Sequence, residues 1–259
     1  MNIHLIQSDI RWEDAPANRA HLDVLIGQPE EGSLIVLPEM FNTGFTIPRP
    51  GVSESMAGET VQWMKQKATS LKCTITGSLI IEEDGDHYNR LCWVTEGGRI
   101  QHYDKRHLFR MAGEDQHFKV GQDQVTVDWH GLKVRLQICY DLRFPVWSRN
   151  QYSQELGYAY DLLIYVANWP AARHHAWEGL IRARAMENIA YCLGVNRAGK
   201  DGKGLDYLGG SVLIDPVGHP VLDAGKKEGN FKTELDVEFL RNFRAKFPVG
   251  LDADDFAIR

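Results

Sequence analysis

The amino-acid sequence predicts a layered α/β fold in a single domain spanning residues 1–259. Segments typical of strands and of helices alternate along the chain, the pattern expected of sheets covered by helices. No internal repeat, low-complexity stretch or linker rich in proline, glycine and serine divides the 259 residues. With 43% hydrophobic and 25% charged residues, the composition is that of a globular domain with a substantial core. Periodicity alone leaves open whether the strands form one sheet or two.

The first half of the chain is expected to alternate between strands and helices. Its best-marked helix begins at Asp14, which is a capping residue, and Pro16 occupies the first turn, where no backbone hydrogen bond is lost. The short β-branched run at residues 34–37 predicts a buried strand. The predicted strands of this half are at residues 3–10, 34–37, 73–81, 88–95 and 99–103. Its predicted helices run from Asp14 to about residue 27 and from residue 59 to 72.

The second half continues the alternation and contains the longest predicted helix. Trp177, Leu180, Ile181 and Ile189 are its expected core contacts. The break at Pro145 predicts a further helix starting at residue 146. The predicted elements of this half are strands at 125–129 and 133–138, a helix from 146, a strand at 161–167, a helix at 174–190 and two strands around the turn 215–218.

Charge and hydropathy argue against several classes of function. The net charge of −6 is fairly evenly spread and offers no basic surface for nucleic acid. No apolar run approaches the roughly 20 residues that cross a bilayer, and the N-terminus lacks the features of an export signal. We therefore expect a cytoplasmic protein with neither a membrane nor a nucleic-acid partner. Its thiols should be reduced, and Cys73, Cys92 and Cys192 have the apolar neighbours of core residues.

Two predicted strands end in chemically reactive residues. Glu39 follows the run 34–37, at the edge where open α/β sheets bind ligands, although the position alone favours a solvated acid at a strand end. Cys139 lies where the strand 133–138 turns towards the next helix. Backbone N–H groups and the positive helix end are expected to lower its pKa and to bind an oxyanion. An isolated cysteine is also a common core residue, so position alone leaves both interpretations open.

Lys105 and Glu114 are ambiguous when each is taken alone. Lys105 lies in the segment 103–109, where Arg106 and His107 also fit a charged surface turn or an anion-binding patch. A buried lysine beside a thiol and a carboxylate would instead stabilise negative charge in a transition state. Glu114 fits a second active-site carboxylate and an exposed loop acid equally well.

Metal and phosphate sites are not predicted. On a helix the side chains of the adjacent His174 and His175 diverge by about 100°, so they do not form a joint ligand face. The sequence contains no His-Glu-x-x-His or Cys-x-x-Cys spacing, and the glycine-rich stretch 199–210 lacks the order of a phosphate-binding loop. We expect no metal and no organic cofactor.

An ordered series of segments matches one family. The matching segments are Leu37-Pro38-Glu39 with Phe41 and Gly44, then 103–109, 138–145, 167–170, 182–188, 196–197 and 206–211. A single match such as Cys139-Tyr140-Asp141 would carry little weight, but the whole series in order is highly specific. On these residues the chain resembles the nitrilase superfamily, and more closely its omega-amidase branch, over nearly its whole length.

The resemblance implies a fold, an assembly and a set of catalytic residues. The fold is a four-layer α-β-β-α sandwich, and members assemble as homodimers or larger homo-oligomers through a helical face. Glu39, Lys105 and Cys139 occupy the positions of the family's catalytic triad. Glu114 stands where many members carry a second active-site glutamate, although the preceding residues 111–113 match more loosely.

The resemblance also implies a reaction. Cys139 attacks the amide of a small molecule and forms a thioester, Glu39 is the general base, and Lys105 with the backbone N–H of Tyr140 holds the oxyanion. The branch points to omega-monoamides of dicarboxylates, such as 2-oxoglutaramate or succinamate, which release ammonia. Two alternatives remain open, namely an N-carbamoyl amino acid, aliphatic amide or nitrile hydrolase, and a non-catalytic binding module on the same fold.

Substrate-binding residues are the least constrained by the sequence. Arg173 precedes the helix at 174–190 and is expected to bind the far carboxylate together with the first N–H groups of that helix, but a surface arginine fits equally well. Phe41, Phe45 and Trp169 are expected to wall the pocket, with core packing as the alternative for each.

Overall fold

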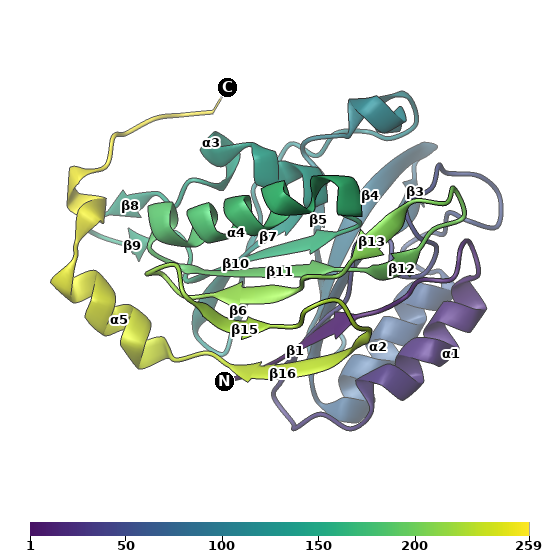
Figure 1. Ribbon diagram of the computed structural model, residues 1–259, viewed down its shortest axis with the longest axis horizontal. Coiled ribbons are helices and arrows are strands. Elements are labelled where there is room, and N and C mark those ends of the chain that lie inside the picture. Colours follow the sequence, from purple (N-terminus) through teal and green to yellow (C-terminus); the bar gives the residue numbers. More distant parts are fainter. Residues whose placement is uncertain (259) are drawn as a thin grey trace.

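Two six-stranded sheets pack face to face, and helices cover the outer face of each, which gives four layers in the order α-β-β-α (Figure 1). This computed structural model describes residues 1–258. The fold class expected from the sequence and from the family resemblance is confirmed. No helix within the described range is long and apolar enough to span a bilayer.

The first sheet contains the N-terminal strands and one strand from the far end of the chain. Its order is β16 (Gly229–Glu234), β1 (Asn2–Gln7), β2 (Leu34–Val36), β3 (Thr74–Glu83), β4 (Asp86–Val94) and β5 (Ile100–Asp104). The strands β1, β2 and β3 are parallel, and the remaining pairs are antiparallel. The helices α1 (Ala15–Ile26) and α2 (Glu59–Leu71) cover its outer face (Figure 1).

The second sheet is built from the C-terminal half. Its order is β15 (Pro220–Asp223), β14 (Val212–Ile214), β11 (Tyr191–Asn196), β10 (Leu162–Ala167), β7 (Leu132–Ile138) and β6 (Thr126–Trp129). The central strands β7, β10 and β11 are parallel, and α4 (His174–Asn188) packs on their outer face. Outside the two sheets lie the hairpins β8 (Tyr152–Ser153) with β9 (Gly157–Tyr158) and β12 (Ala198–Lys200) with β13 (Asp206–Leu208), and the helices α3 (Pro145–Ser148) and α5 (Val237–Lys246). Short 3₁₀ helices span Arg110–Ala112, Glu114–Gln116, Cys139–Arg143, Ala171–Arg173 and Val249–Asp252.

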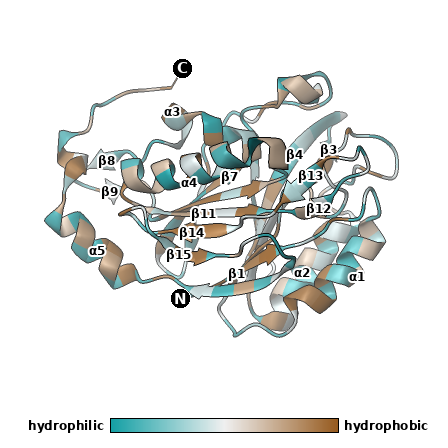
Figure 2. Cartoon of the chain, viewed as in Figure 1, coloured by the Kyte–Doolittle hydropathy of each residue, from teal (hydrophilic) through white to brown (hydrophobic). Residues whose placement is uncertain are grey.

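The sandwich buries both faces of its central strands. Within β7, Leu136 and Ile138 face the core between the two sheets, and in β11 Leu193 faces that core while Cys192 faces α4. This two-sided burial explains why the central strands are nearly continuous apolar runs rather than alternating ones (Figure 2).

Most elements predicted from the sequence are present. Asp14 caps α1 by accepting a hydrogen bond from the backbone N–H of Ala17 at 3.0 Å, and Trp177 and Ile181 of α4 are buried. The helix expected from residue 146 is present, but it is the single turn α3 and begins at Pro145. The strands missed were β8, β9, β11, β12, β13 and β16, and the helix missed was α5. No residue of β16 is buried, and α5 buries only Leu240, so neither segment contains the continuous apolar run typical of a core element.

Candidate active site

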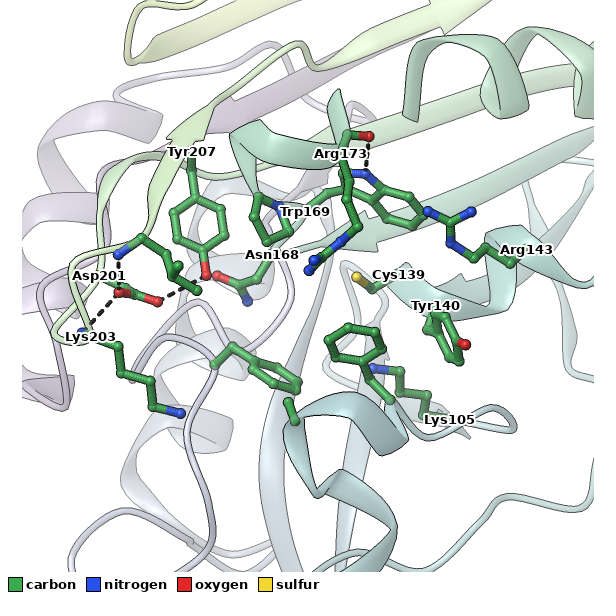
Figure 3. A pocket seen from close by; sticks show the side chains of 15 residues that line it. Lys105, Cys139, Tyr140, Arg143, Asn168, Trp169, Arg173, Asp201, Lys203 and Tyr207 are labelled. Atoms are coloured by element: carbon green, nitrogen blue, oxygen red, sulfur yellow. Dashed lines mark hydrogen bonds between the residues drawn. The ribbon is translucent and has the colours of Figure 1, made fainter. Parts of the chain in front are cut away.

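The site lies where strands of the two sheets end side by side. Glu39 and Lys105 follow β2 and β5 of the first sheet, while Cys139 and Asn168 follow β7 and β10 of the second. Lys105, Cys139 and Asn168 line a cavity of about 260 Å³ at this edge (Figure 3). Carboxyl ends of parallel strands are the usual place for ligand sites in α/β sheets. The site is therefore assembled from segments of both sheets.

Lys105 is a buried cation that joins two buried carboxylates. Its Nζ donates to Glu39 Oε1 at 2.9 Å, and to Glu114 Oε1 and Oε2 at 3.1 and 2.9 Å. None of the three side chains is more than 1% exposed. Burial alone would lower the pKa of Lys105, but the charges of Glu114 and Glu39 outweigh burial and hold that pKa above its ordinary value. The ammonium is therefore charged throughout the physiological range.

The two carboxylate oxygens of Glu39 are held differently. Oε1 accepts from Lys105 Nζ and, at 2.8 Å, from Asn89 Nδ2. Oε2 accepts from the backbone N–H of Asn168 at 2.8 Å, and the Asn168 side chain donates to the Glu39 carbonyl at 2.6 Å. The Cys139 thiol lies close enough to this carboxylate and to the Asn168 N–H for both groups to influence its pKa, the carboxylate by raising it and the N–H by lowering it. Because Oε1 already has two donors, Oε2 is the oxygen with a lone pair left for the thiol proton.

Glu114 is the second carboxylate of the cluster. It begins the 3₁₀ helix Glu114–Gln116, and its Oε2 accepts from the backbone N–H of Phe109 at 2.6 Å. Asn89 Nδ2 donates to its Oε1 at 3.1 Å as well as to Glu39, so one amide bridges both acids. Burial raises the pKa of Glu114; the Lys105 charge opposes this rise, and the Glu39 charge adds to it. The structure thus places Glu114 inside the cluster and not on an exposed loop.

Cys139 occupies a strained turn at the floor of the cavity. Its φ of +41° is in the left-handed region, which non-glycine residues rarely adopt. The residue is half-buried because its thiol opens on the cavity. Burial raises the pKa of this thiol well above its ordinary value, the Glu39 charge raises it further, and Lys105 only partly opposes them. The expectation of a lowered pKa is therefore wrong, because desolvation and the nearby carboxylate outweigh the backbone donors and the lysine.

Tyr140 follows Cys139 in the first turn of the 3₁₀ helix Cys139–Arg143. The first N–H groups of a helix have no acceptor within it, so the Tyr140 N–H is available to a ligand beside the thiol. The Tyr140 ring packs at 5.0 Å from that of Phe109 and at 5.1 Å from that of Phe144, and it lines the cavity. These contacts fix the turn that carries the N–H group.

Aromatic side chains form much of the cavity wall, but not all of the expected ones. Phe45 and Trp169 line the cavity, and the Phe45 ring centroid lies 5.4 Å from Lys105 Nζ. Phe41 is fully buried in the core between the first sheet and its helices, 5.9 Å from the ring of Trp63. The expectation that Phe41 walls the pocket is wrong, because its side chain points to the helix side of the sheet.

Three cationic side chains besides Lys105 line the cavity. Arg173 points into the cavity (Figure 3), with its guanidinium 5.2 Å from the ring centroid of Phe109. The Arg143 guanidinium lies 5.0 Å from a ring centroid of Trp169, and Lys203 lines the opposite wall. Their combined charge favours a substrate with an anionic group several bonds from the reacting atom.

The wall opposite Arg143 is formed by the loop between β12 and β13. Asp201 accepts from the Tyr207 hydroxyl at 3.0 Å and from the backbone N–H groups of Lys203 and Leu205, each at 2.9 Å. The Asp201 carboxylate is thus committed to its own loop, and it shapes the wall without offering a free acid to a ligand.

Asn89 and Asn168 were not identified from the sequence as site residues. Asn168 follows β10 just as Cys139 follows β7, so the same strand-end argument would have found it. Asn89 lies in the middle of β4, where an asparagine is no more notable than the neighbouring polar residues. Arg143 was also missed as a cavity residue. Within residues 1–258, no group of three or more histidine, cysteine, aspartate or glutamate side chains is arranged to hold a metal ion.

Comparisons with known proteins agree on one family. The family model of carbon-nitrogen hydrolases matches residues 2–245. The chain is 42% identical to the omega-amidase YafV of Escherichia coli strain K12, over 100% of this chain and 98% of the relative. It is 28% identical to the 2-oxoglutaramate amidase of Bacillus subtilis strain 168, over 95% of each. Among solved structures, XC1258 from Xanthomonas campestris, a CN-hydrolase superfamily protein with an arsenic adduct in its active site, matches with a TM-score of 0.94 and 40% identity, over 100% of this chain and 99% of the other.

Proposed function

This chain belongs to the carbon-nitrogen hydrolase family of the nitrilase superfamily, and from that premise we propose that it is an omega-amidase acting through Cys139. As a member of this family it hydrolyses carbon-nitrogen bonds of linear amides, not peptide bonds. One observation carries the proposal: buried Lys105 joins the carboxylates of Glu39 and Glu114 beside a thiol in a cavity that cationic side chains help to line.

The first step is proton transfer with attack. Glu39 Oε2 takes the thiol proton while the Cys139 sulfur bonds to the amide carbon, and the carbonyl π electrons move to oxygen. The raised pKa keeps the thiol neutral at rest, so deprotonation accompanies attack and does not precede it. This order distinguishes the site from one that stores a thiolate.

Two donors hold the resulting oxyanion. The Tyr140 N–H is one, and the Lys105 ammonium is the other. Both oxygens of the Glu114 carboxylate lie near Nζ, so one bifurcated N–H can serve them, and a third N–H of Lys105 is left for the oxyanion. Loss of one such donor typically lowers kcat by about 10²–10³.

The remaining steps return the enzyme to its starting state. Protonated Glu39 gives its proton to the amide nitrogen, the C–N bond breaks, and ammonia leaves a thioester on Cys139. A water molecule then attacks the thioester carbon while Glu39 takes its proton. Cleavage of the C–S bond and return of that proton to sulfur regenerate the thiol and release the carboxylic acid.

The cavity supports a small amide with a distant carboxylate. At about 260 Å³ it is smaller than the pockets that hold drug-sized ligands. Arg173 and Arg143 line the cavity and can bind an anion, while Phe45 and Trp169 offer apolar surface to an aliphatic spacer. The omega-monoamides 2-oxoglutaramate and succinamate fit these requirements, and the name of the Bacillus subtilis relative agrees with the first of them. We further propose that the enzyme assembles as a homodimer or a larger homo-oligomer through a helical face, as its family resemblance implies.

A substrate panel with trapping of the intermediate tests the proposal. Ammonia release is measured from 2-oxoglutaramate, succinamate, N-carbamoyl amino acids and neutral aliphatic amides, with and without Cys139→Ala. We expect turnover of the first two, complete loss in the variant, and a mass increment on Cys139 equal to the acyl group. Cys73→Ala is the matched control, since Cys73 lies at the opposite end of the first sheet, and it should keep full activity. Turnover of carbamoyl compounds alone would overturn the omega-amidase assignment.

A further inference from the structure

We infer that Asp141 is a positioning residue. It fixes the position of Cys139, which follows a strand of the second sheet, relative to Lys105, which follows a strand of the first. The inference rests on the proposed function, in which those two side chains act on the same substrate carbonyl. Asp141 is fully buried, lies two residues after Cys139, and takes no part in the proposed chemistry. Its contacts therefore require another explanation.

Asp141 accepts four hydrogen bonds from two different sheets. Oδ2 accepts from the backbone N–H of Ile138 at 3.0 Å and from the Tyr103 hydroxyl at 2.7 Å. Oδ1 accepts from the backbone N–H of His107 at 2.9 Å, and it lies 2.8 Å from the His107 Nδ1 atom. Ile138 belongs to the second sheet, whereas Tyr103 belongs to β5 of the first sheet and His107 to the loop after it.

These four contacts flank the two catalytic candidates along the chain. Ile138 immediately precedes Cys139, and Lys105 lies midway between Tyr103 and His107. One carboxylate thus fixes the residue before the nucleophile and both sides of the lysine. Bonds to a buried charged acceptor are stronger than bonds between neutral groups, so this link resists relative movement of the two sheets.

The turn at Cys139 needs such support. Its φ of +41° costs free energy in a residue with a Cβ atom, and such strain persists only where surrounding contacts hold the conformation. The hydrogen bond from Ile138 N–H to Asp141 holds the chain as it enters this turn. Without it, the sulfur and the Tyr140 N–H would both move relative to Lys105.

A second link on the other side of the site makes the role of Asp141 specific. The backbone and side chain of Asn168 tie the second sheet to Glu39. If the Asp141 link is lost, the general base Glu39 therefore remains tied to the second sheet, but Lys105 is no longer held in place relative to Cys139. We expect the damage to appear in oxyanion stabilisation, and hence in kcat, while the cationic side chains of the cavity still bind substrate.

Asparagine cannot replace Asp141 without a conflict. Each carboxylate oxygen faces a backbone N–H, from Ile138 on one side and His107 on the other, and a backbone N–H cannot become an acceptor. In either orientation, the amide group of Asp141→Asn places N–H against N–H. In each orientation the amide oxygen keeps one backbone N–H bond and the amide nitrogen opposes the other, so the substitution weakens the link while it nearly preserves side-chain size.

The test compares Asp141→Asn with Asp161→Asn. Asp161 also accepts from a backbone N–H, that of Lys133, and from an arginine, but it lies at the opposite end of β7 and β10. Both variants should lower the unfolding temperature. Only Asp141→Asn should lower kcat, by about 10²-fold as expected for a misplacement of about 1 Å, with little change in KM. If Asp141→Asn does not fold, Tyr103→Phe, which removes one of the four bonds, replaces it and should show a smaller loss with the same kcat-against-KM split.

Alkylation of Cys139 by iodoacetamide separates this inference from the proposed function, because it requires no turnover of an amide. We expect slower alkylation in Asp141→Asn than in wild type and in Asp161→Asn. Failure of wild type to release ammonia from the amide panel would refute the proposed function but not the alkylation result. Folded Asp141→Asn with wild-type alkylation and wild-type kcat, or a loss confined to KM, would overturn the positioning role.

Discussion

Replacing Lys105 by methionine tests the charge balance of the site, because it removes the ammonium while keeping a long side chain. Glu39 and Glu114 would then face each other in a buried cluster. The donors left to them are Asn89 Nδ2, which is already shared, and the backbone N–H groups of Asn168 and Phe109. Removing one partner of a buried ion pair typically costs about 3–5 kcal/mol. Two carboxylates lose their shared cation here, so we expect the upper end of that range at neutral pH.

The loss of folding stability caused by Lys105→Met should increase as the pH rises. Lys105 opposes the rise in the pKa of Glu114 that burial and Glu39 cause, so its loss raises that pKa further. A carboxyl group in an unfolded chain titrates near about 4.3. Above that value the unfolded chain releases its proton before the folded variant does, so stability falls as pH rises towards the folded pKa. The variant should be close to wild type near pH 4 and much less stable near pH 8.

Urea unfolding at pH values from about 4 to 8, with ammonia release measured alongside, checks both expectations. Turnover should fall by at least about 10²–10³-fold, because one oxyanion donor is lost. The double variant Lys105→Met with Glu114→Gln should recover much of the stability and none of the activity, since it removes one of the two buried charges. Lys72→Met is the matched control, because its pair with Glu31 is solvent-exposed and should contribute little. A destabilisation that does not change with pH would refute the charge-balance argument.

Two further predictions follow from Cys139 and from a glycine behind Lys105. Because the pKa of the Cys139 thiol is raised, its alkylation by iodoacetamide should keep accelerating beyond pH 8.5, the region where free thiols titrate; a plateau at lower pH would contradict this. A Cβ at Gly121 would lie 1.9 Å from the Asp104 carbonyl oxygen, and the Gly121 N–H donates to the Lys105 carbonyl at 2.9 Å. Gly121→Ala should therefore lower the free energy of unfolding by about 1–3 kcal/mol and lower kcat. Gly97→Ala is the control, because a Cβ there would meet only Thr95 Oγ1, at 4.0 Å. Equal behaviour of the two variants would refute this account.

The sequence located reactive side chains but not their relative positions. Glu39, Lys105 and Cys139 each follow a predicted strand, and strand ends are visible in the hydrophobic pattern. Their proximity depends on how two sheets pack, and periodicity within one strand carries no information about that. The ordered family segments indicated that the three residues belong to one site. Without those segments, Lys105 fits a surface turn as well as a buried site.

Sequence patterns did not identify site residues that lie in the middle of a strand. Asn89 is fully buried in β4 and donates to both Glu39 and Glu114, yet it follows Tyr88 and precedes Arg90 in a strand with several polar residues. Nothing local distinguishes an asparagine that bridges two acids from one that faces solvent. Phe41 shows the converse, since its place beside Glu39 in the sequence says nothing about which face of the sheet it occupies.

The wrong prediction for the Cys139 pKa has the same origin and a mechanistic consequence. Sequence position supplied the helix-end donors, which favour a thiolate, but the number of acids around the sulfur depends on tertiary packing. Two carboxylates share one lysine, so with a neutral thiol the cluster already carries a net negative charge, and a resting thiolate would add a second. The reactivity of the site therefore depends on the positioned general base Glu39 and not on a preformed Cys139 thiolate. Substrate binding, which places the carbonyl oxygen near Lys105 and the Tyr140 N–H, makes transfer of the thiol proton favourable only when there is an amide to attack.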